Sequence, residues 1–98
     1  MTLEQKRKDV DQVDDEILAL LSRRAEIVRE LTQIKLNSGL PLIDWSREAE
    51  IIQRALNNSG SLKEVSANRI YRAILREARQ MEIDLAQSAE NSSVSIAR

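Results

Sequence analysis

Apolar residues recur at alternating steps of three and four over the first third of the chain, which predicts a long amphipathic helix from about Leu3 to Asn37. Seven of the eight positions of this stripe are aliphatic and one is an arginine: Val10, Val13, Ile17, Leu20, Arg24, Ile27, Leu31 and Ile34. A guanidinium on an apolar stripe loses hydration unless an anion meets it. We therefore expect Arg24 either to pair with a carboxylate, Asp14 or Glu82, or to bind an anionic ligand.

A second cation, Lys35, lies eleven residues after Arg24 and shares its helix face. At about 100° per residue the two side chains point about 20° apart and lie about 16 Å from each other, a span that suits a small dianion. Arg7 stands seventeen residues before Arg24 and points about 100° away from this face. If Arg7 serves a similar site, we expect it to do so on a neighbouring chain.

The segment after this helix predicts a turn and then a second helix. Gly39, followed closely by a proline, is a strong helix stop. Asp44 is the expected N-cap of a second helix from about Trp45 to Asn57. Arg47 and Glu48 fall in its first turn, where side chains and free backbone N–H groups can face a ligand together.

A third helix is expected from about Leu62 to Leu85. Ser61 and Glu64 have the spacing of a capping box, and an apolar stripe follows them. By its spacing, Glu82 lies on this stripe among aliphatic residues. A carboxyl group is thus predicted on the inner face of the third helix.

The length of the chain predicts one all-α domain that does not stand alone. We expect residues 1–87 to form a three-helix domain and the polar residues 88–98 to form a frayed tail. A first helix of this length is about 50 Å long, more than the width of a compact domain of this size. Homo-oligomerisation is the expected way to cover its apolar stripe.

The composition restricts the possible chemistry. Fifteen basic and sixteen acidic residues, with no basic patch among aromatics, make nucleic acid an unexpected partner. The chain has no long apolar run and no cysteine, so we expect a cytoplasmic protein without membrane contacts or disulfides. Without histidine and cysteine, the usual zinc sites, thiol nucleophiles and Ser-His triads are excluded. Electrostatic catalysis or carboxylate acid-base chemistry remains.

Six short segments form an ordered pattern along the chain. They are Arg7-x-x-Val10-Asp11-x-x-Asp14, Leu20-Leu21-x-x-Arg24, Ile34-Lys35, Gly39-Leu40-Pro41, Asp44-x-x-Arg47-Glu48 and Ile70-Tyr71-Arg72-x-Ile74. Each segment is weak by itself, but the ordered set with its spacing is specific. Over about residues 5 to 85 the chain resembles the all-helical (AroQ-type) chorismate mutases.

The resemblance implies an intertwined homodimer of three-helix chains with two equivalent active sites. Each site would rearrange chorismate to prephenate, on the way to phenylalanine and tyrosine, without a cofactor or a metal. A unimolecular rearrangement needs no nucleophile, which agrees with the composition. Its physical demand is to hold a flexible dianion in a compact conformer and to stabilise charge on the ether oxygen.

The resemblance also assigns roles to single residues. Arg24 matches the arginine that binds one substrate carboxylate within its own chain, and Arg7 matches the arginine that reaches the other carboxylate in the partner's site. Lys35 matches the lysine that contacts the ether oxygen and a carboxylate. The matches around the ring hydroxyl are Asp44, Glu48 and, beside them, Arg47.

Two positions of the third helix depart from the family pattern. Many bacterial members have a serine where this chain has Ala78, and a glutamine that donates to the ether oxygen where it has Glu82. Some members, notably fungal ones, have glutamate there. A protonated glutamate donates as glutamine does, whereas an ionised one only accepts. We expect activity to be higher under mildly acidic conditions, unless burial raises the Glu82 pKa enough to keep it protonated near neutrality.

Two other functions stay open at this point. Isochorismate-pyruvate lyase is a relative that uses the same fold and cations, and the Asp44-x-x-Arg47-Glu48 segment favours the mutase over it. A non-catalytic dimerisation or regulatory module would bind chorismate or prephenate without turnover, and Ala78 and Glu82 favour this alternative.

The other conspicuous side chains of the chain have simpler expected roles. Trp45 is predicted to be a packing residue. Charges that recur on the outer sides of the helices are predicted to be solvated: Arg23, Arg29, Arg72, Arg76 and Arg79.

Overall fold

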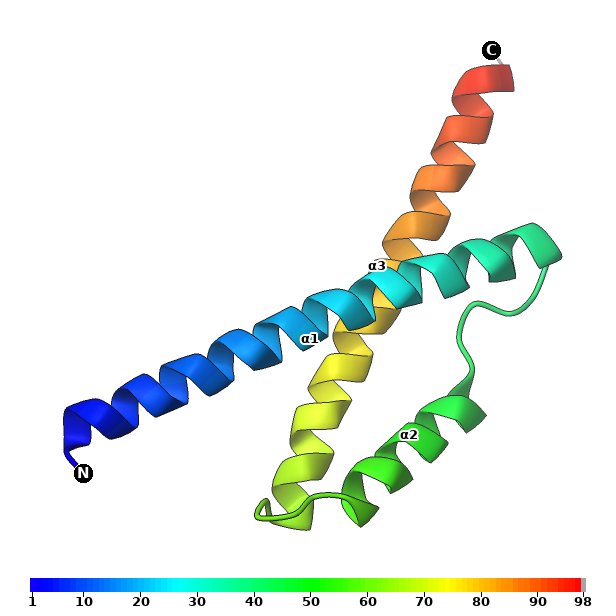
Figure 1. Ribbon diagram of the computed structural model, residues 1–98. Coiled ribbons are helices and arrows are strands. Elements are labelled where there is room, and N and C mark those ends of the chain that lie inside the picture. The colour runs from blue at the N-terminus through cyan, green and yellow to red at the C-terminus, as the bar shows by residue number, and fades with distance from the viewer. Residues whose placement is uncertain (98) are drawn as a thin grey trace.

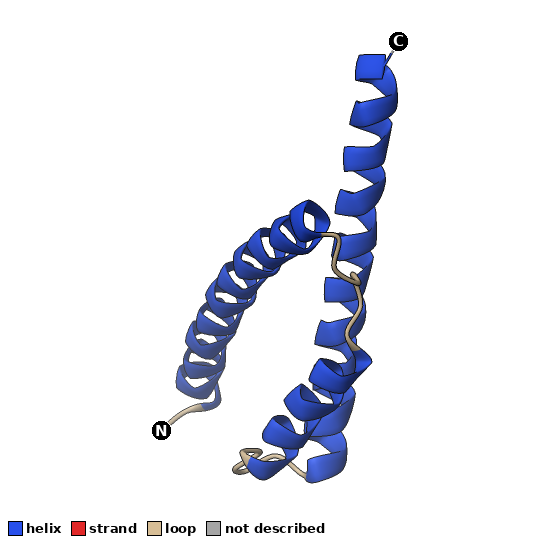
Figure 2. Ribbon diagram, turned by 90° about the vertical axis from the view of Figure 1, so that its right-hand side faces the viewer, coloured by secondary structure: helices blue, strands red, loops and turns tan. Residues whose placement is uncertain are grey.

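The computed structural model describes residues 1–97, which form three helices: α1 (Leu3–Ser38), α2 (Trp45–Asn57) and α3 (Glu64–Ala97). Helices α2 and α3 run side by side, whereas α1 crosses α3 and its N-terminal half projects away from both (Figure 1, Figure 2). The prediction of an all-α chain with a very long first helix is therefore confirmed over the described residues.

Both ends of α1 follow from local side-chain and backbone chemistry. The Thr2 hydroxyl accepts a hydrogen bond from the backbone N–H of Gln5, and the Gln5 side chain accepts one from the backbone N–H of Thr2, which is a capping box. At the other end, Gly39 has a φ of 64°, a left-handed conformation that only glycine adopts without strain. The predicted stop at Gly39 is confirmed.

Helix α2 also has the predicted bounds, Trp45–Asn57. The Asp44 carboxylate accepts a hydrogen bond of 3.0 Å from the backbone N–H of Arg47 and so caps the helix, as predicted.

Helix α3 begins two residues later than predicted, at Glu64. The backbone N–H of Leu62 donates to the carbonyl of Ser59 in a turn, and the carbonyl of Lys63 accepts the first helical hydrogen bonds. The expectation that Ser61 starts the helix is therefore wrong.

The C-terminal end of α3 lies well beyond the predicted end near Leu85, since the helix continues to Ala97. No glycine or proline occurs after Gly60, so the sequence contains no strong helix stop in this part. The division into a domain of residues 1–87 and a tail of residues 88–98 stays a prediction. Arg98, the last residue of that tail, lies outside the described residues.

The small core lies where α1 and α2 pack on α3. Val28 and Thr32 of α1 and Ala67 and Leu75 of α3 are buried. The Thr32 hydroxyl donates a hydrogen bond of 2.7 Å to the carbonyl of Val28, so burying it leaves no donor unpaired. This core occupies only the C-terminal half of α1.

The overall shape is elongated, with extents of 65 × 28 × 16 Å and a radius of gyration of 17.8 Å. A compact domain of this length has a radius of gyration of about 13 Å. The apolar stripe of α1 is largely solvent-exposed in the single chain, at Val10, Val13, Ile17, Leu20, Ile27, Leu31 and Ile34. As far as the structure describes them, none of the three helices has the length and apolar character needed to cross a membrane.

Candidate active site

A cavity of about 240 Å³, the inner cavity, lies where the three helices meet. It is lined by seven of the eight site residues that the sequence predicts: Arg24, Lys35, Asp44, Arg47, Glu48, Ala78 and Glu82. Side chains that are far apart in the sequence thus come together at one place. Arg7 is the exception, because it is exposed near the N-terminus of α1 and does not line this cavity.

Lys35 is held in the inner cavity by the connector that follows α1. Its Nζ donates a hydrogen bond of 2.8 Å to the carbonyl of Leu42 and lies 3.7 Å from Oε1 of Glu82. The two charged side chains are only 23% and 13% exposed, so their attraction is less screened by water than that of a surface pair. This ion pair ties the end of α1 to the middle of α3.

Burial raises the pKa of the Glu82 carboxyl group above its ordinary value. Lys35 opposes this through its nearby positive charge, Glu48 adds to it by repulsion, and Arg24 opposes it more weakly. The net direction is upward, because desolvation disfavours the charged form most. The direction agrees with the condition under which Glu82 serves as a hydrogen-bond donor.

Arg24 is half-buried on the face of α1 that points to the other two helices. No carboxylate of the described residues lies within ion-pair distance of it, and Glu82 is instead paired with Lys35. Of the two interpretations of Arg24 from the sequence, pairing with Asp14 or Glu82 is therefore not the one observed. The interpretation that Arg24 binds an anionic ligand stays a prediction.

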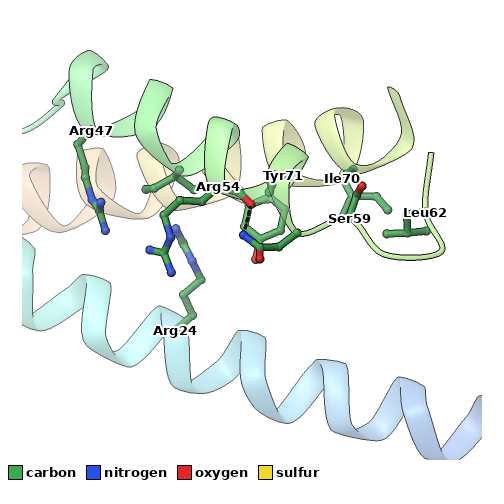
Figure 3. Close-up of a pocket in the computed structure, with 11 residues that line it drawn as sticks. Arg24, Arg47, Arg54, Ser59, Leu62, Ile70 and Tyr71 are labelled. Atoms are coloured by element: carbon green, nitrogen blue, oxygen red, sulfur yellow. Dashed lines mark hydrogen bonds between the residues drawn. The ribbon is translucent and has the colours of Figure 1, made fainter. Parts of the chain in front are cut away.

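A second cavity of about 460 Å³, the outer pocket, adjoins the inner cavity and shares Arg24, Arg47 and Ile51 with it. Three arginines and no acidic residue line the outer pocket. In Figure 3, Arg24 from α1 and Arg54 from α2 extend into the same space, and Arg47 lies two turns nearer the start of α2. The positive charge of this pocket favours an anion.

Arg54 was not predicted as a site residue, although the sequence carries a signal for it. It follows Arg47 by seven residues, which is two helical turns and places both arginines on one face of α2. The α2 helix alone does not reveal that this face meets Arg24, because that depends on how α1 crosses α3.

Arg79 is a correction to the sequence analysis, which predicted a solvated side chain. It is half-buried, forms an ion pair with Glu48 of α2, and its guanidinium lies 5.2 Å from the ring centroid of Trp45. Trp45 is largely exposed and stacks with Arg79 rather than packing in the core. The other four arginines of that group are exposed as predicted: Arg23, Arg29, Arg72 and Arg76.

The inner cavity and the outer pocket together have the volume of a small-molecule site. Their charges provide several fixed cations and two half-buried carboxyl groups, Glu48 and Glu82. Within the described part of the chain, no acidic residues cluster in a way that would hold a metal ion. The arrangement can bind a small dianion and place a lysine and a carboxyl group beside it.

These features define an all-α protein with a cationic cavity at a helix crossing. A family model described as chorismate mutase type II matches residues 6–83 of the chain. The chain belongs to the type II chorismate mutase family, and the resemblance found in the sequence is confirmed.

Curated relatives agree with this family. The chain is 32% identical over 85 residues to a bifunctional chorismate mutase/prephenate dehydratase of Aquifex aeolicus, covering 82% of this chain and 24% of that protein. It is 40% identical over 48 residues to the intracellular chorismate mutase of Mycobacterium tuberculosis, covering 49% of this chain and 46% of that protein. The chain thus spans less than half the length of either relative.

A solved structure supports the fold over nearly the whole of its own length. A conserved hypothetical protein from Pyrococcus furiosus superposes with a TM-score of 0.71 at 30% sequence identity. The match covers 84% of this chain and 96% of that chain. The three-helix arrangement is therefore shared with a chain of similar size.

The variant Glu82→Gln should change how folding stability depends on pH. Because the folded chain raises the Glu82 pKa, the native protein loses stability relative to the variant as pH rises from the unfolded-state value through the raised folded value. We expect the difference in unfolding free energy to move in the variant's favour from about pH 4 towards neutrality. Urea denaturation followed by circular dichroism, at one protein concentration, measures it.

The control for this experiment is Glu26→Gln, at an exposed position of α1. Parallel pH dependences for native protein and Glu82→Gln would show that the fold does not favour the protonated form of Glu82.

Proposed function

We propose that this chain is a chorismate mutase that rearranges chorismate to prephenate in the biosynthesis of phenylalanine and tyrosine. The observation that carries this proposal is the convergence of Arg24, Lys35 and Glu82 on the inner cavity, with Glu48 facing them from α2. The relatives named as chorismate mutases support the same reaction. The cytoplasmic location expected from the sequence is part of this proposal.

The reaction needs a site that binds two carboxylates and stabilises charge on an ether oxygen as its C–O bond breaks. Arg24, which has no carboxylate within ion-pair distance among the described residues, is suited to one substrate carboxylate. Lys35, held by the carbonyl of Leu42, is suited to the ether oxygen, where a fixed cation stabilises the developing charge without reorganising. The fixed positions of these groups also favour the compact substrate conformer.

Glu82 completes the site as a second donor to the ether oxygen. In its protonated form the carboxyl group donates a hydrogen bond, as an amide does. Protonation also removes the negative charge that would compete with the substrate for Lys35. Glu48 and Asp44 would accept a hydrogen bond from the ring hydroxyl, with Arg47 beside them. Ala78 also lines the cavity but adds no polar contact to the substrate.

The proposal includes an intertwined homodimer in which the partner supplies Arg7. In the single chain, Arg7 is exposed and far along α1 from the core, and the α1 stripe is largely exposed. A second α1 packed along this stripe would bury these aliphatic side chains and bring an arginine to the site of its neighbour. The outer pocket adjoins this site and adds a third arginine, Arg54, to it.

Turnover of chorismate is the first test. We expect the purified protein to consume the chorismate diene absorbance and to form prephenate, and Arg24→Ala or Lys35→Ala to lower kcat/KM by at least about a hundredfold, because each removes a contact to developing or fixed charge. Arg29→Ala, at an exposed position of α1, is the matched control and should keep native activity.

The outcomes of this test separate the functions that the sequence leaves open. Binding of chorismate without turnover would favour a regulatory module, and turnover of isochorismate instead of chorismate would favour the lyase. Either result would refute the mutase.

Activity should also depend on the protonation of Glu82. Since burial raises its pKa and only the protonated form donates, we expect kcat/KM to be highest below the folded pKa and to fall as pH rises through it. The variant Glu82→Gln donates at every pH and should give a flat profile over the same range. Identical profiles for the two proteins would contradict the role of Glu82.

The partner's contribution can be tested with a heterodimer. Arg7→Ala and Arg24→Ala homodimers each lack one cation at both sites, and both should be nearly inactive. In a heterodimer of the two variants one site has both arginines and the other has neither, so we expect about half of native activity. Two affinity tags allow the heterodimer to be purified and assayed. An inactive heterodimer would place Arg7 within its own chain's site, and an active Arg7→Ala homodimer would place it outside any site.

A further inference from the structure

The contact that joins α2 to α3 beside the inner cavity is an ion pair between Glu48 and Arg79. The two residues are 31 positions apart, and their side chains are only 17% and 27% exposed. The exposed pairs Lys6–Asp9 and Arg47–Glu50 lie within single helices and are of the kind that adds little to stability. The Glu48–Arg79 pair is different because it fixes one helix relative to another.

Arg79 is itself restrained on two sides. Its guanidinium lies over the ring of Trp45, the first residue of α2, while it donates a hydrogen bond to Glu48 one turn further along the same helix. A planar guanidinium can stack on an aromatic face and bind a carboxylate at the same time, which a lysine ammonium does less well. The geometry therefore gives the Glu48 carboxylate one defined position.

Glu48 shares the inner cavity with a second carboxyl group, that of Glu82. The charged groups that line this cavity come from all three helices and from the cap of α2: Arg24, Lys35, Asp44, Arg47, Glu48, Arg79 and Glu82. Two carboxylates in one site compete, because the charge of one disfavours ionisation of the other. Glu48 does contribute to the raised pKa of Glu82, so the two groups interact.

We propose that Arg79 is a positioning residue that holds the Glu48 carboxylate as a hydrogen-bond acceptor for the ligand and screens its charge from Glu82. The first part of this role rests on the proposed function, in which Glu48 accepts from the substrate hydroxyl. The second part concerns the free protein and holds whatever the reaction is. Arg79 acts through Glu48 in both.

The direct test is the titration of Glu82 in the free protein, followed by NMR of the carboxyl carbons of ¹³C-labelled glutamate. In Arg79→Met the charge of Glu48 is no longer screened, so we expect the Glu82 pKa to rise above that of the native chain. In a Glu48→Gln background the same arginine substitution should raise the Glu82 pKa by less, because only the arginine's own charge is then lost and no neighbouring carboxylate is released.

Two controls make this titration specific. Arg76→Met removes an exposed arginine from the same helix and should leave the Glu82 titration unchanged. If circular dichroism shows that Arg79→Met loses helix content, Arg79→Gln replaces it, because glutamine keeps a polar contact to Glu48 without the charge. The screening role is refuted if Glu82 titrates as in the native chain in both Arg79→Met and Arg79→Gln, or if the shift is just as large in the Glu48→Gln background.

A kinetic experiment tests the positioning of Glu48. A misplaced acceptor weakens ground state and transition state alike, so we expect Arg79→Met to raise KM for chorismate about tenfold with a smaller change in kcat, and Arg79→Lys to recover part of the loss. An unchanged KM in an active Arg79→Met protein would refute the positioning role. If the native protein itself has no turnover, the proposed function fails, while the titration still decides the screening role of Arg79.

Discussion

The first helix has 36 residues but packs on α3 over only part of its length, and this constraint shapes the rest of the molecule. Only its C-terminal half meets α3, where Val28 and Thr32 are buried. The N-terminal half projects away from the other two helices (Figure 2), and its apolar stripe is exposed. Arg7 lies on this half and does not line the inner cavity. The same helix therefore carries two of the cations that line the inner cavity, Arg24 and Lys35, and a largely exposed apolar stripe.

The site is built at a helix crossing, where charges meet that the sequence keeps far apart. The end of α1 supplies Lys35, the start of α2 supplies Glu48, and the middle of α3 supplies Glu82. Partial burial strengthens the interactions between these charges relative to those at the surface. The balance of attraction, repulsion and desolvation then determines which form of each group is favoured. The raised pKa of Glu82 is the visible result of that balance, since desolvation outweighs the attraction of Lys35.

Local chemistry made the bounds of α1 and α2 predictable, whereas the contacts between helices could not be predicted from the sequence. The caps Thr2, Gly39 and Asp44 act within a few residues of themselves, so the sequence alone locates α1 and α2 correctly. The start of α3 was misplaced because Ser61 and Leu62 belong to a turn, in which the Leu62 N–H donates to the Ser59 carbonyl, and the first helical hydrogen bonds go to Lys63. Arg79 was missed for another reason. Its partner, Glu48, is 31 positions away, and charged residues recur along α3 in the way that is typical of a solvated helix face. Family resemblance supplied the remaining cavity residues, which spacing on single helices does not bring together.

The hydrogen bond from Lys35 to the carbonyl of Leu42 gives the short connector between α1 and α2 a second function. A backbone carbonyl fixes the lysine, so its position depends on the length and path of the connector rather than on the identity of the connector's side chains. Sequence drift in this segment is thus compatible with an unchanged site, whereas the insertion or deletion of a single residue would move the ammonium group. The number of residues between the helix caps Gly39 and Asp44 then determines where the carbonyl that holds the ammonium group lies.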